Sequence, residues 1–181
     1  MSAIRFALVG AAIASAAIAT GGQSRGAAGP AAPGASVEIN DASGSLRATG
    51  TLQQRADGIA IHIEAHGMKP GSYGIHVHTV GQCAGPAFAS AGGHWNPGGK
   101  QHGRDNPMGM HQGDLPNLVI GTDGSGTLDA VIAGGKLNDG PTALLDADGG
   151  AIVIHAAADD YKTDPSGNSG ARVACGVVHA A

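Results

Sequence analysis

Two histidines separated by one residue stand in the segment Gly74-Ile75-His76-Val77-His78, and a third ends the apolar run Ala151-Ile152-Val153-Ile154-His155. Because side chains alternate along an extended chain, His76 and His78 project from one face of a strand while the apolar residues beside them take the other. His155 has the same relation to its own run. Imidazole nitrogens on rigid strands suit a copper or zinc ion. We therefore predict a metal site on the outer face of a β-structure, formed by these three histidines.

A second group of potential ligands lies in a segment rich in Gly, Pro and Asn. The potential ligands, three histidines and a carboxylate that span 21 residues, are His94, His102, His111 and Asp114. Such a segment has too few apolar residues to fold by burial, so a tetrahedral zinc site with three His ligands and one Asp ligand would organise it. A solvated loop without a metal ion is the alternative that this segment, taken alone, leaves open.

The strands that would position these ligands are indicated by short runs of alternating apolar residues, separated by turns rich in Gly, Asn and Asp. Beyond residue 35 no apolar stripe has helical spacing. The pattern predicts an all-β fold, an eight-stranded antiparallel barrel or sandwich. The runs cover residues 37–39, 46–52, 59–63, 73–77, 117–121, 127–133, 151–155 and 172–178.

Two long gaps interrupt the series of strands, at about residues 81–115 and 159–171. Loops of this length inside a compact domain are usually functional. The first gap holds the loop histidines, so we expect it to cover the strand histidines. The second gap carries Asp160, Lys162 and Asp164. Lys162 is a candidate for attracting an anionic substrate, and an ordinary solvated lysine is the alternative.

The N-terminal residues have the composition of an export signal. Arg5 is the only charge before an apolar run from Phe6 to Ala19, which is too short to span a bilayer as a helix and ends in a small-x-small cleavage pattern. We interpret residues 1–19 as a signal peptide, 20–35 as a flexible linker and 36–181 as one folded domain. A buried N-terminal helix is the alternative. The expected location is periplasmic or secreted, with no stable membrane anchor after signal removal, because no cysteine directly follows the apolar run.

Export bears on the two cysteines of the chain, Cys83 and Cys175. In an oxidising compartment they can pair, and the bridge would close a loop of about 90 residues. Two free thiols are the alternative.

Four sequence runs, in their order along the chain, resemble those of the copper/zinc superoxide dismutases, in particular the bacterial exported type. They are GIHVHTVGQC, GGHWNPGGKQHG, HQGDLPN and GARVACGVV, and the match extends from Ser36 to Val178. The resemblance implies that the barrel has Greek-key topology. It also implies one copper ion and one zinc ion per subunit as cofactors.

The resemblance assigns a role to each candidate residue. His94 would bridge the two metals, and Asp159 would link His76 to His102 through its carboxylate, which would fix the orientation of both rings. Arg172 would lie in the substrate channel, and Cys83 would pair with Cys175. The implied copper ligands are His76, His78, His94 and His155, and the implied zinc ligands are His94, His102, His111 and Asp114.

The implied activity is the conversion of two superoxide anions and two protons into dioxygen and hydrogen peroxide by redox cycling of copper. Zinc, which has no redox chemistry, would be structural. Arg172, always charged, would dock the substrate anion beside the copper. An ion pair between Arg172 and a surface carboxylate is the alternative for that residue. The resemblance leaves a homodimer open, and the copper donor is unknown.

Two other functions are alternatives to superoxide dismutation. A copper or zinc carrier on the same fold would need neither an anion-docking arginine nor a carboxylate between two metal sites. A mononuclear zinc hydrolase would have no use for seven ligands arranged around His94. Nucleic-acid binding is not expected, because the net charge is −4 and the chain has no basic cluster or aromatic platform. His62, His66 and His179 match no ligand position and are assigned no chemistry.

Overall fold

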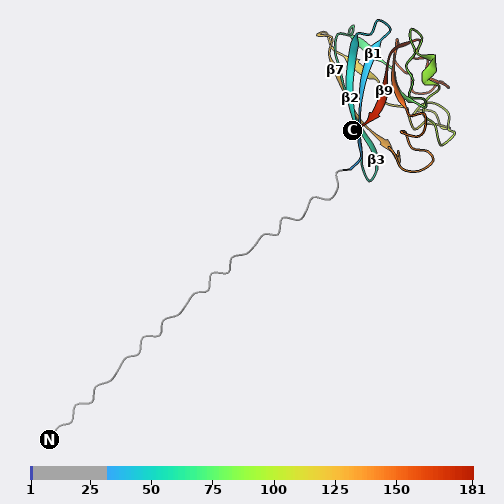
Figure 1. The fold of residues 1–181 in the computed structure, drawn as a ribbon. Coiled ribbons are helices and arrows are strands. Elements are labelled where there is room, and N and C mark those ends of the chain that lie inside the picture. The colour runs from blue at the N-terminus through green and yellow to red at the C-terminus, as the bar shows by residue number, and fades with distance from the viewer. Residues whose placement is uncertain (2–31) are drawn as a thin grey trace. The chain divides into compact units, whose positions relative to one another are not determined.

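The computed structural model describes Met1 and residues 32–181 (Figure 1). The predicted signal peptide (1–19) and most of the predicted linker (20–35) therefore lie outside the described residues. The first strand begins at Gly34, two residues before the predicted start of the folded domain. In the described part of the chain, no helix has the length and apolar character needed to cross a membrane.

Residues 32–181 form an antiparallel all-β fold, as predicted, with nine strands in place of the expected eight (Figure 1). Seven strands form one sheet in the order β5-β8-β9-β1-β2-β3-β7, and β4 pairs separately with β6. The strands are β1 (Gly34–Asp41), β2 (Leu46–Gln54), β3 (Gly58–Ala65), β4 (Gly71–Tyr73), β5 (Ile75–His78), β6 (Leu118–Ile120), β7 (Gly126–Ala133), β8 (Ala151–His155) and β9 (Arg172–Ala180).

The alternation of apolar residues sets which face of the sheet is buried. In β3, Ile59, Ile61 and Ile63 are buried, with the polar residues His62 and Glu64 between and beside them turned outward. Burying each isoleucine side chain contributes about 1.5–3 kcal/mol relative to leaving it in water. The buried faces of the strands enclose one main core of aliphatic side chains.

The predicted strand 73–77 is two strands in the structure. Gly74 separates β4 from β5, and the two segments pair with different partners, β6 and β8. Alternation of side chains does not reveal this break, because Tyr73 and Ile75 keep the same parity across Gly74. A Cβ atom at Gly74 would lie 2.8 Å from the Cβ of Ser169, so close packing against the second long loop accounts for the glycine.

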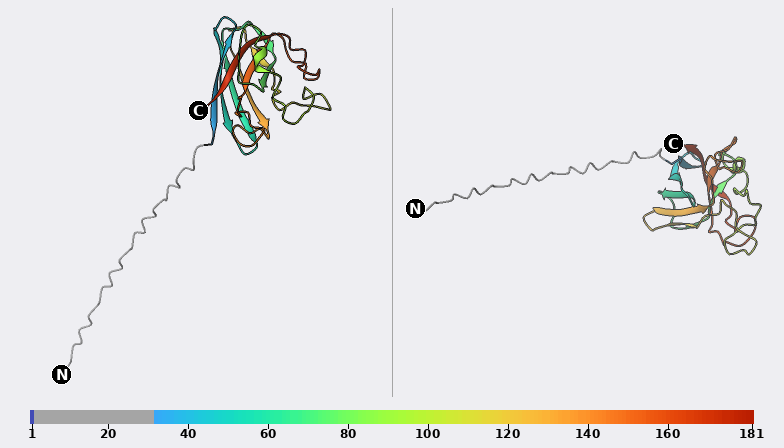
Figure 2. Two further views of the ribbon diagram at one scale, coloured as in Figure 1. Left: turned by 45° about the vertical axis from the view of Figure 1, so that its right-hand side comes forward. Right: turned by 90° about the horizontal axis from the view of Figure 1, so that it is seen from below.

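The connections include both of the long loops expected from the sequence. The loop between β5 and β6 contains one turn of 3-10 helix, η1 (Ala89–Ala91), and the loop between β8 and β9 has no regular element. Figures 1 and 2 show the loops gathered on the side of the sheet away from β1 and β2. A third long connection, residues 134–150, buries Leu137 and Leu144 in the main core.

The predicted disulfide between Cys83 and Cys175 is present, with the two Cα atoms 5.6 Å apart. It joins the long β5–β6 loop to the middle of β9 and links residues 92 positions apart in the sequence. The bond restricts the unfolded chain and also attaches the loop to the sheet.

We expect the double substitution Cys83→Ser and Cys175→Ser to lower the free energy of unfolding by about 2–5 kcal/mol, because the unfolded chain regains the entropy of a long loop. Urea denaturation of the oxidised protein and of the variant measures the difference. Reductant serves as the control: it should bring the native chain to the stability of the variant and leave the variant unchanged. Equal stability of the oxidised protein and the variant would contradict this expectation.

Candidate metal centre

Three of the candidate histidines are brought together by the pairing of β5 with β8. His76 lies opposite Val153 in this ladder, and His155 is the last residue of β8, where the pairing of β8 with β9 shifts register. All three rings are buried although they are on the face opposite the main core, because the loops cover them. The ring centroid of His155 is 4.8 Å from that of His76 and 5.9 Å from that of His78. The same-face geometry predicted from alternation is thus present.

Four buried ring nitrogens have no hydrogen-bond partner, and among the residues that the structure describes they are the only such side-chain atoms. They are Nδ1 of His76 and Nε2 of His78, His94 and His155. An unpaired buried polar atom costs about 1–3 kcal/mol, so four in one place require an explanation. One ligand atom from each of the four residues lies within 4.8 Å of the other three. A soft or borderline transition-metal ion that takes four nitrogen ligands fits this arrangement, and copper is such an ion.

The other nitrogen of each of these rings is occupied, which fixes where the lone pair points. His78 Nδ1 lies 3.0 Å from the carbonyl oxygen of Gly92, and His155 Nδ1 lies 3.2 Å from that of Gly170. A carbonyl oxygen accepts only, so both Nδ1 atoms donate and both Nε2 atoms keep a free lone pair. In His76 the nitrogens are exchanged: Nε2 lies 2.7 Å from Oδ2 of Asp159, so Nε2 donates and Nδ1 keeps the free lone pair.

Burial keeps these rings neutral. It lowers the pKa of His76 to about 3, of His78 to about 2 and of His155 to about 4, and it also lowers the pKa of His94. Metal ligation requires a deprotonated imidazole nitrogen. At neutral pH all four rings are therefore in the form that binds a metal ion.

A second cluster converges on one oxygen of Asp114. Its Oδ1 atom lies 2.9 Å from Nδ1 of His94, 2.9 Å from Nδ1 of His102 and 3.2 Å from Nδ1 of His111. Its Oδ2 atom accepts hydrogen bonds from the backbone N–H groups of Gly103 and His111, which hold the carboxylate in place. Three imidazole nitrogens and one carboxylate oxygen are a common ligand set for tetrahedral zinc.

On this side, one group of potential ligand atoms that all lie within 4.8 Å of one another comes from His76, His94, His102 and Asp114, and it does not include the expected His111. His76 enters it because its ring stacks on His94 with centroids 4.0 Å apart. However, its Nε2 is bound by Asp159, and its Nδ1 belongs to the group of four unpaired nitrogens. His111 has a direct contact to the shared oxygen, and its Nδ1 is also 3.3 Å from that of His94.

Two residues connect the clusters. The ring of His94 presents Nδ1 to Asp114 and Nε2 to the strand histidines. Asp159, fully enclosed, lies with Oδ2 2.7 Å from His76 Nε2 and Oδ1 3.0 Å from His102 Nε2. His94 and Asp159 therefore each contact both clusters.

Charges differ on the two sides of the centre. Burial alone would lower the pKa of His102, but the carboxylates of Asp114 and Asp159 raise it to about 9. Burial alone would raise the pKa of Asp159, yet hydrogen bonds from His102 and His76 hold it well below its ordinary range. Without a metal ion His102 is thus protonated at neutral pH, and uptake of a cation by Asp114 and His102 must release a proton.

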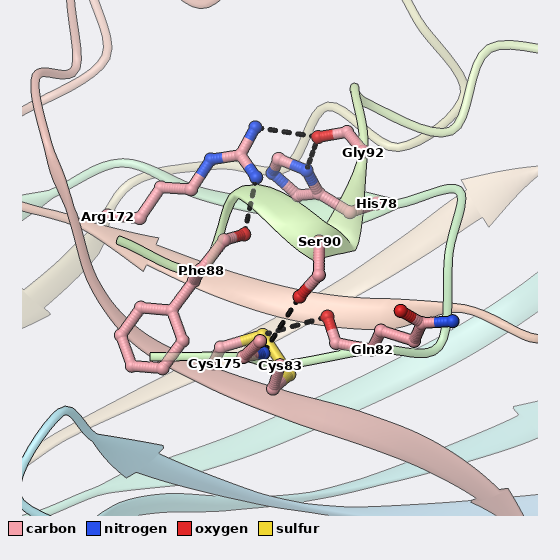
Figure 3. The surroundings of a disulfide bond; sticks show 9 residues. His78, Gln82, Cys83, Phe88, Ser90, Gly92, Arg172 and Cys175 are labelled. Atoms are coloured by element: carbon pink, nitrogen blue, oxygen red, sulfur yellow. Dashed lines mark hydrogen bonds between the residues drawn. A yellow bond between two sulfur atoms is a disulfide. The ribbon is translucent and has the colours of Figure 1, made fainter. Parts of the chain in front are cut away.

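Arg172 is half-buried and oriented by the long β5–β6 loop (Figure 3). Its Nη1 donates to the carbonyl oxygen of Phe88 at 2.7 Å, and its Nη2 donates to that of Gly92 at 2.6 Å. The Gly92 oxygen also accepts from His78, and the disulfide of Cys175 fixes the loop nearby. Within residues 32–181 no carboxylate lies within 4.0 Å of Arg172, so the surface ion pair considered as an alternative is not formed.

One residue near the centre was not identified from the sequence. Asp164 accepts a hydrogen bond from the backbone N–H of His102 at 2.6 Å, and its Oδ1 lies 3.8 Å from Nε2 of His111. Its only sequence signal was a charge in the second loop. Lys162, the candidate for substrate attraction, is exposed in the same loop. His62, as expected, is partly exposed and bonded to Asp129 at 2.7 Å, away from both clusters.

Comparisons with known proteins agree with this geometry. The family model described as copper/zinc superoxide dismutase matches residues 43–178. The superoxide dismutase-like protein YojM of Bacillus subtilis (strain 168) is 49% identical over 131 residues, which are 67% of this chain but only 63% of that protein. Superoxide dismutase [Cu-Zn] 2 of Aquifex aeolicus is 39% identical over 146 residues, 80% of this chain and 85% of that protein. A crystal structure of a SOD-like protein from Bacillus subtilis has a TM-score of 0.75 and 43% identity, covering 78% of this chain and 96% of that one.

We expect the substitution His94→Ala to weaken metal binding in both clusters, because the ring of His94 contributes a nitrogen to each. The loss should exceed about 100-fold, the upper end of what removing an outer partner of a metal ligand costs. Metal content after dialysis with copper and zinc, measured by elemental analysis, tests this. His62→Ala, which removes a histidine that belongs to neither cluster, is the control and should retain both metals. Retention of both metals by His94→Ala would show that the two clusters do not share this residue.

Proposed function

The chain belongs to the copper/zinc superoxide dismutase family, and we propose that its histidine clusters hold one copper ion and one zinc ion joined by His94. The observation that carries the proposal is the set of four unpaired, buried and neutral ring nitrogens that face one another. The proposed copper ligands are His76, His78, His94 and His155. The proposed zinc ligands are His94, His102, His111 and Asp114.

The activity is the conversion of two superoxide anions and two protons into dioxygen and hydrogen peroxide. Copper, when bound, supplies the one-electron chemistry, and zinc supplies a fixed positive charge without redox activity. The protein supplies a rigid set of neutral imidazoles on β5 and β8. It also supplies the wall of loops that encloses them.

His94 is the residue placed to hold a proton at the centre. Its Nε2 atom is the one that faces the strand histidines, while its Nδ1 remains engaged on the side of Asp114. A proton held at Nε2 would therefore stand beside the copper site. Its position is fixed because the Asp114 side of the ring cannot turn without losing that contact.

Arg172 is proposed to dock the substrate anion. The carbonyl oxygens of Phe88 and Gly92 orient its guanidinium group but carry no full charge. Arginine has five N–H donors, so some remain for a ligand, and no carboxylate of residues 32–181 within 4.0 Å neutralises it. A local positive charge can attract a small anion even though the net charge of the chain is −4. This unpaired arginine favours the enzyme over a non-catalytic metal carrier.

We also infer export from the cell. The disulfide between Cys83 and Cys175 suits an oxidising compartment such as the periplasm. The apolar run Phe6–Ala19 is typical of a signal peptide that is cleaved on export. Together they support a mature protein without its first 19 residues.

We expect the chain loaded with copper and zinc to contain one ion of each per subunit and to consume superoxide. Elemental analysis and superoxide consumption should be measured on the same sample. Two metal ions per chain without consumption of superoxide would overturn the enzymatic proposal and favour the carrier.

The substitution Arg172→Ala should slow superoxide consumption by roughly 10-fold or more, because the site loses its local attraction for the anion. Metal content should be unchanged, since Arg172 bonds only backbone oxygens of the loop. Arg172→Lys keeps the charge but not the paired N–H geometry, so its rate of superoxide consumption should lie between those of the native protein and of Arg172→Ala. Undiminished rates in Arg172→Ala at low and high ionic strength would exclude a role for this residue in docking.

Expression of the full chain in a bacterial host should yield a protein in the periplasmic or secreted fraction whose N-terminus is at Thr20. Mass spectrometry of the purified protein measures its N-terminal residue. A variant with Ile13→Arg, which places a charge in the apolar run, is the matched control and should remain uncleaved in the cytoplasm. An uncleaved native chain in the cytoplasm would contradict the export proposal.

A further inference from the structure

Asn117 holds the backbone of Asp159 with both ends of its side-chain amide. Its Oδ1 accepts a hydrogen bond from the N–H of Asp159 at 2.8 Å, and its Nδ2 donates to the carbonyl oxygen of Asp159 at 2.9 Å. The two residues are 42 positions apart in the sequence. Two bonds from one planar group restrict both the position and the rotation of the Asp159 backbone.

Asn117 is itself fixed by its surroundings. It directly precedes β6, which pairs with β4, and its own N–H donates to the hydroxyl of Tyr161 at 2.8 Å. The N–H of Tyr161 in turn donates to Oδ1 of Asp159 at 2.6 Å. The guanidinium carbon of Arg104 lies 3.8 Å above the ring of Tyr161. Asn117, Asp159 and Tyr161 thus form a closed ring of hydrogen bonds.

The carboxylate of Asp159 has little freedom to adjust. Its two oxygens must reach His76 and His102, which belong to different clusters. Gly167 packs against this carboxylate, and an added Cβ atom there would collide with Oδ1 of Asp159. A shift of the Asp159 backbone would therefore lengthen one of its two bonds to histidine rather than be absorbed by the side chain.

From this geometry we propose that Asn117 is a positioning residue for the metal centre, acting through Asp159. It keeps the Asp159 carboxylate where it can hold the ring of His76 on the copper side and the ring of His102 on the zinc side. The proposal rests on the ligand assignment given above. It concerns metal retention and ring orientation, which are measured separately from superoxide consumption.

The test is the rate of zinc release to a chelator from the full chain loaded with copper and zinc. Removing an outer partner of a ligand commonly costs 10–100-fold in metal affinity, and Asn117 is one step further out, so Asn117→Ala should release zinc about 10-fold faster. Gln54→Ala is the matched control. Gln54 also joins distant backbone segments through its amide, at Gly58 and Leu137, but it touches no residue of the centre. The control should lower stability and leave zinc release unchanged.

A double-mutant cycle separates positioning from a general loss of stability. If Asn117 acts through Asp159, adding Asn117→Ala to Asp159→Asn should not accelerate zinc release further, because interacting residues are not additive. If Asn117 contributed only to general stability, each substitution would accelerate zinc release by its own factor, and the two factors would multiply in the double variant. Multiplying effects, or zinc release from Asn117→Ala at the native rate, would overturn the proposal.

A spectroscopic measurement checks the same point without zinc release. In the protein loaded with zinc and with reduced copper, the ring N–H protons of His76 and His102 should give nuclear magnetic resonance signals that exchange slowly with water. The substitution Asn117→Ala should make this exchange faster. If Asn117→Ala does not fold, Tyr161→Phe replaces it, because this substitution removes only the hydroxyl that accepts the hydrogen bond from the Asn117 N–H. Exchange of the two ring protons should then be faster than in the native protein, by a smaller factor. Unchanged exchange in the variant that folds would count against the proposal.

Discussion

The burial of imidazole nitrogens without partners in the protein is the constraint on which the rest of the structure depends. Four such atoms face one another, and each is left bare because the other nitrogen of its ring is occupied. The unfavourable burial is tolerated only if a cation completes the site. The sheet and the long loops bury these nitrogens, which keeps the rings neutral. The carboxylates of Asp159 and Asp114 bind the opposite nitrogens of His76 and His94 and so orient these two rings.

The two metal sites proposed here differ in how their ligands are held. On the copper side three rings stand on paired strands, where the ladder between β5 and β8 sets their spacing. On the zinc side the ligands come from one long loop and are gathered by the carboxylate of Asp114. His94 and Asp159 each contact both clusters, so the ligands of the long loop are joined to the paired strands β5 and β8.

Much of this arrangement could be predicted from the sequence because it follows from local rules. Alternation placed His76 and His78 on one face, located most strands and identified the two loops that enclose the centre. Three features were not predictable in this way. Gly74 divides a run in which the alternation of side chains continues without a break. The connection 134–150 contributes Leu137 and Leu144 to the core. Asn117 and Asp164 form hydrogen bonds to residues that are distant in the sequence. Periodicity describes neighbours along the chain and carries no information on which distant side chains meet.

The carbonyl oxygen of Gly92 accepts hydrogen bonds from both His78 and Arg172. This has a consequence for protein engineering. Copying the histidines of β5 and β8 onto another barrel would reproduce the imidazoles but leave His78 without its tautomer partner and the guanidinium without its support. The smallest transferable unit therefore includes the two strands, the loop segment from Cys83 to Gly92, and the bridge to Cys175 that keeps that segment in place.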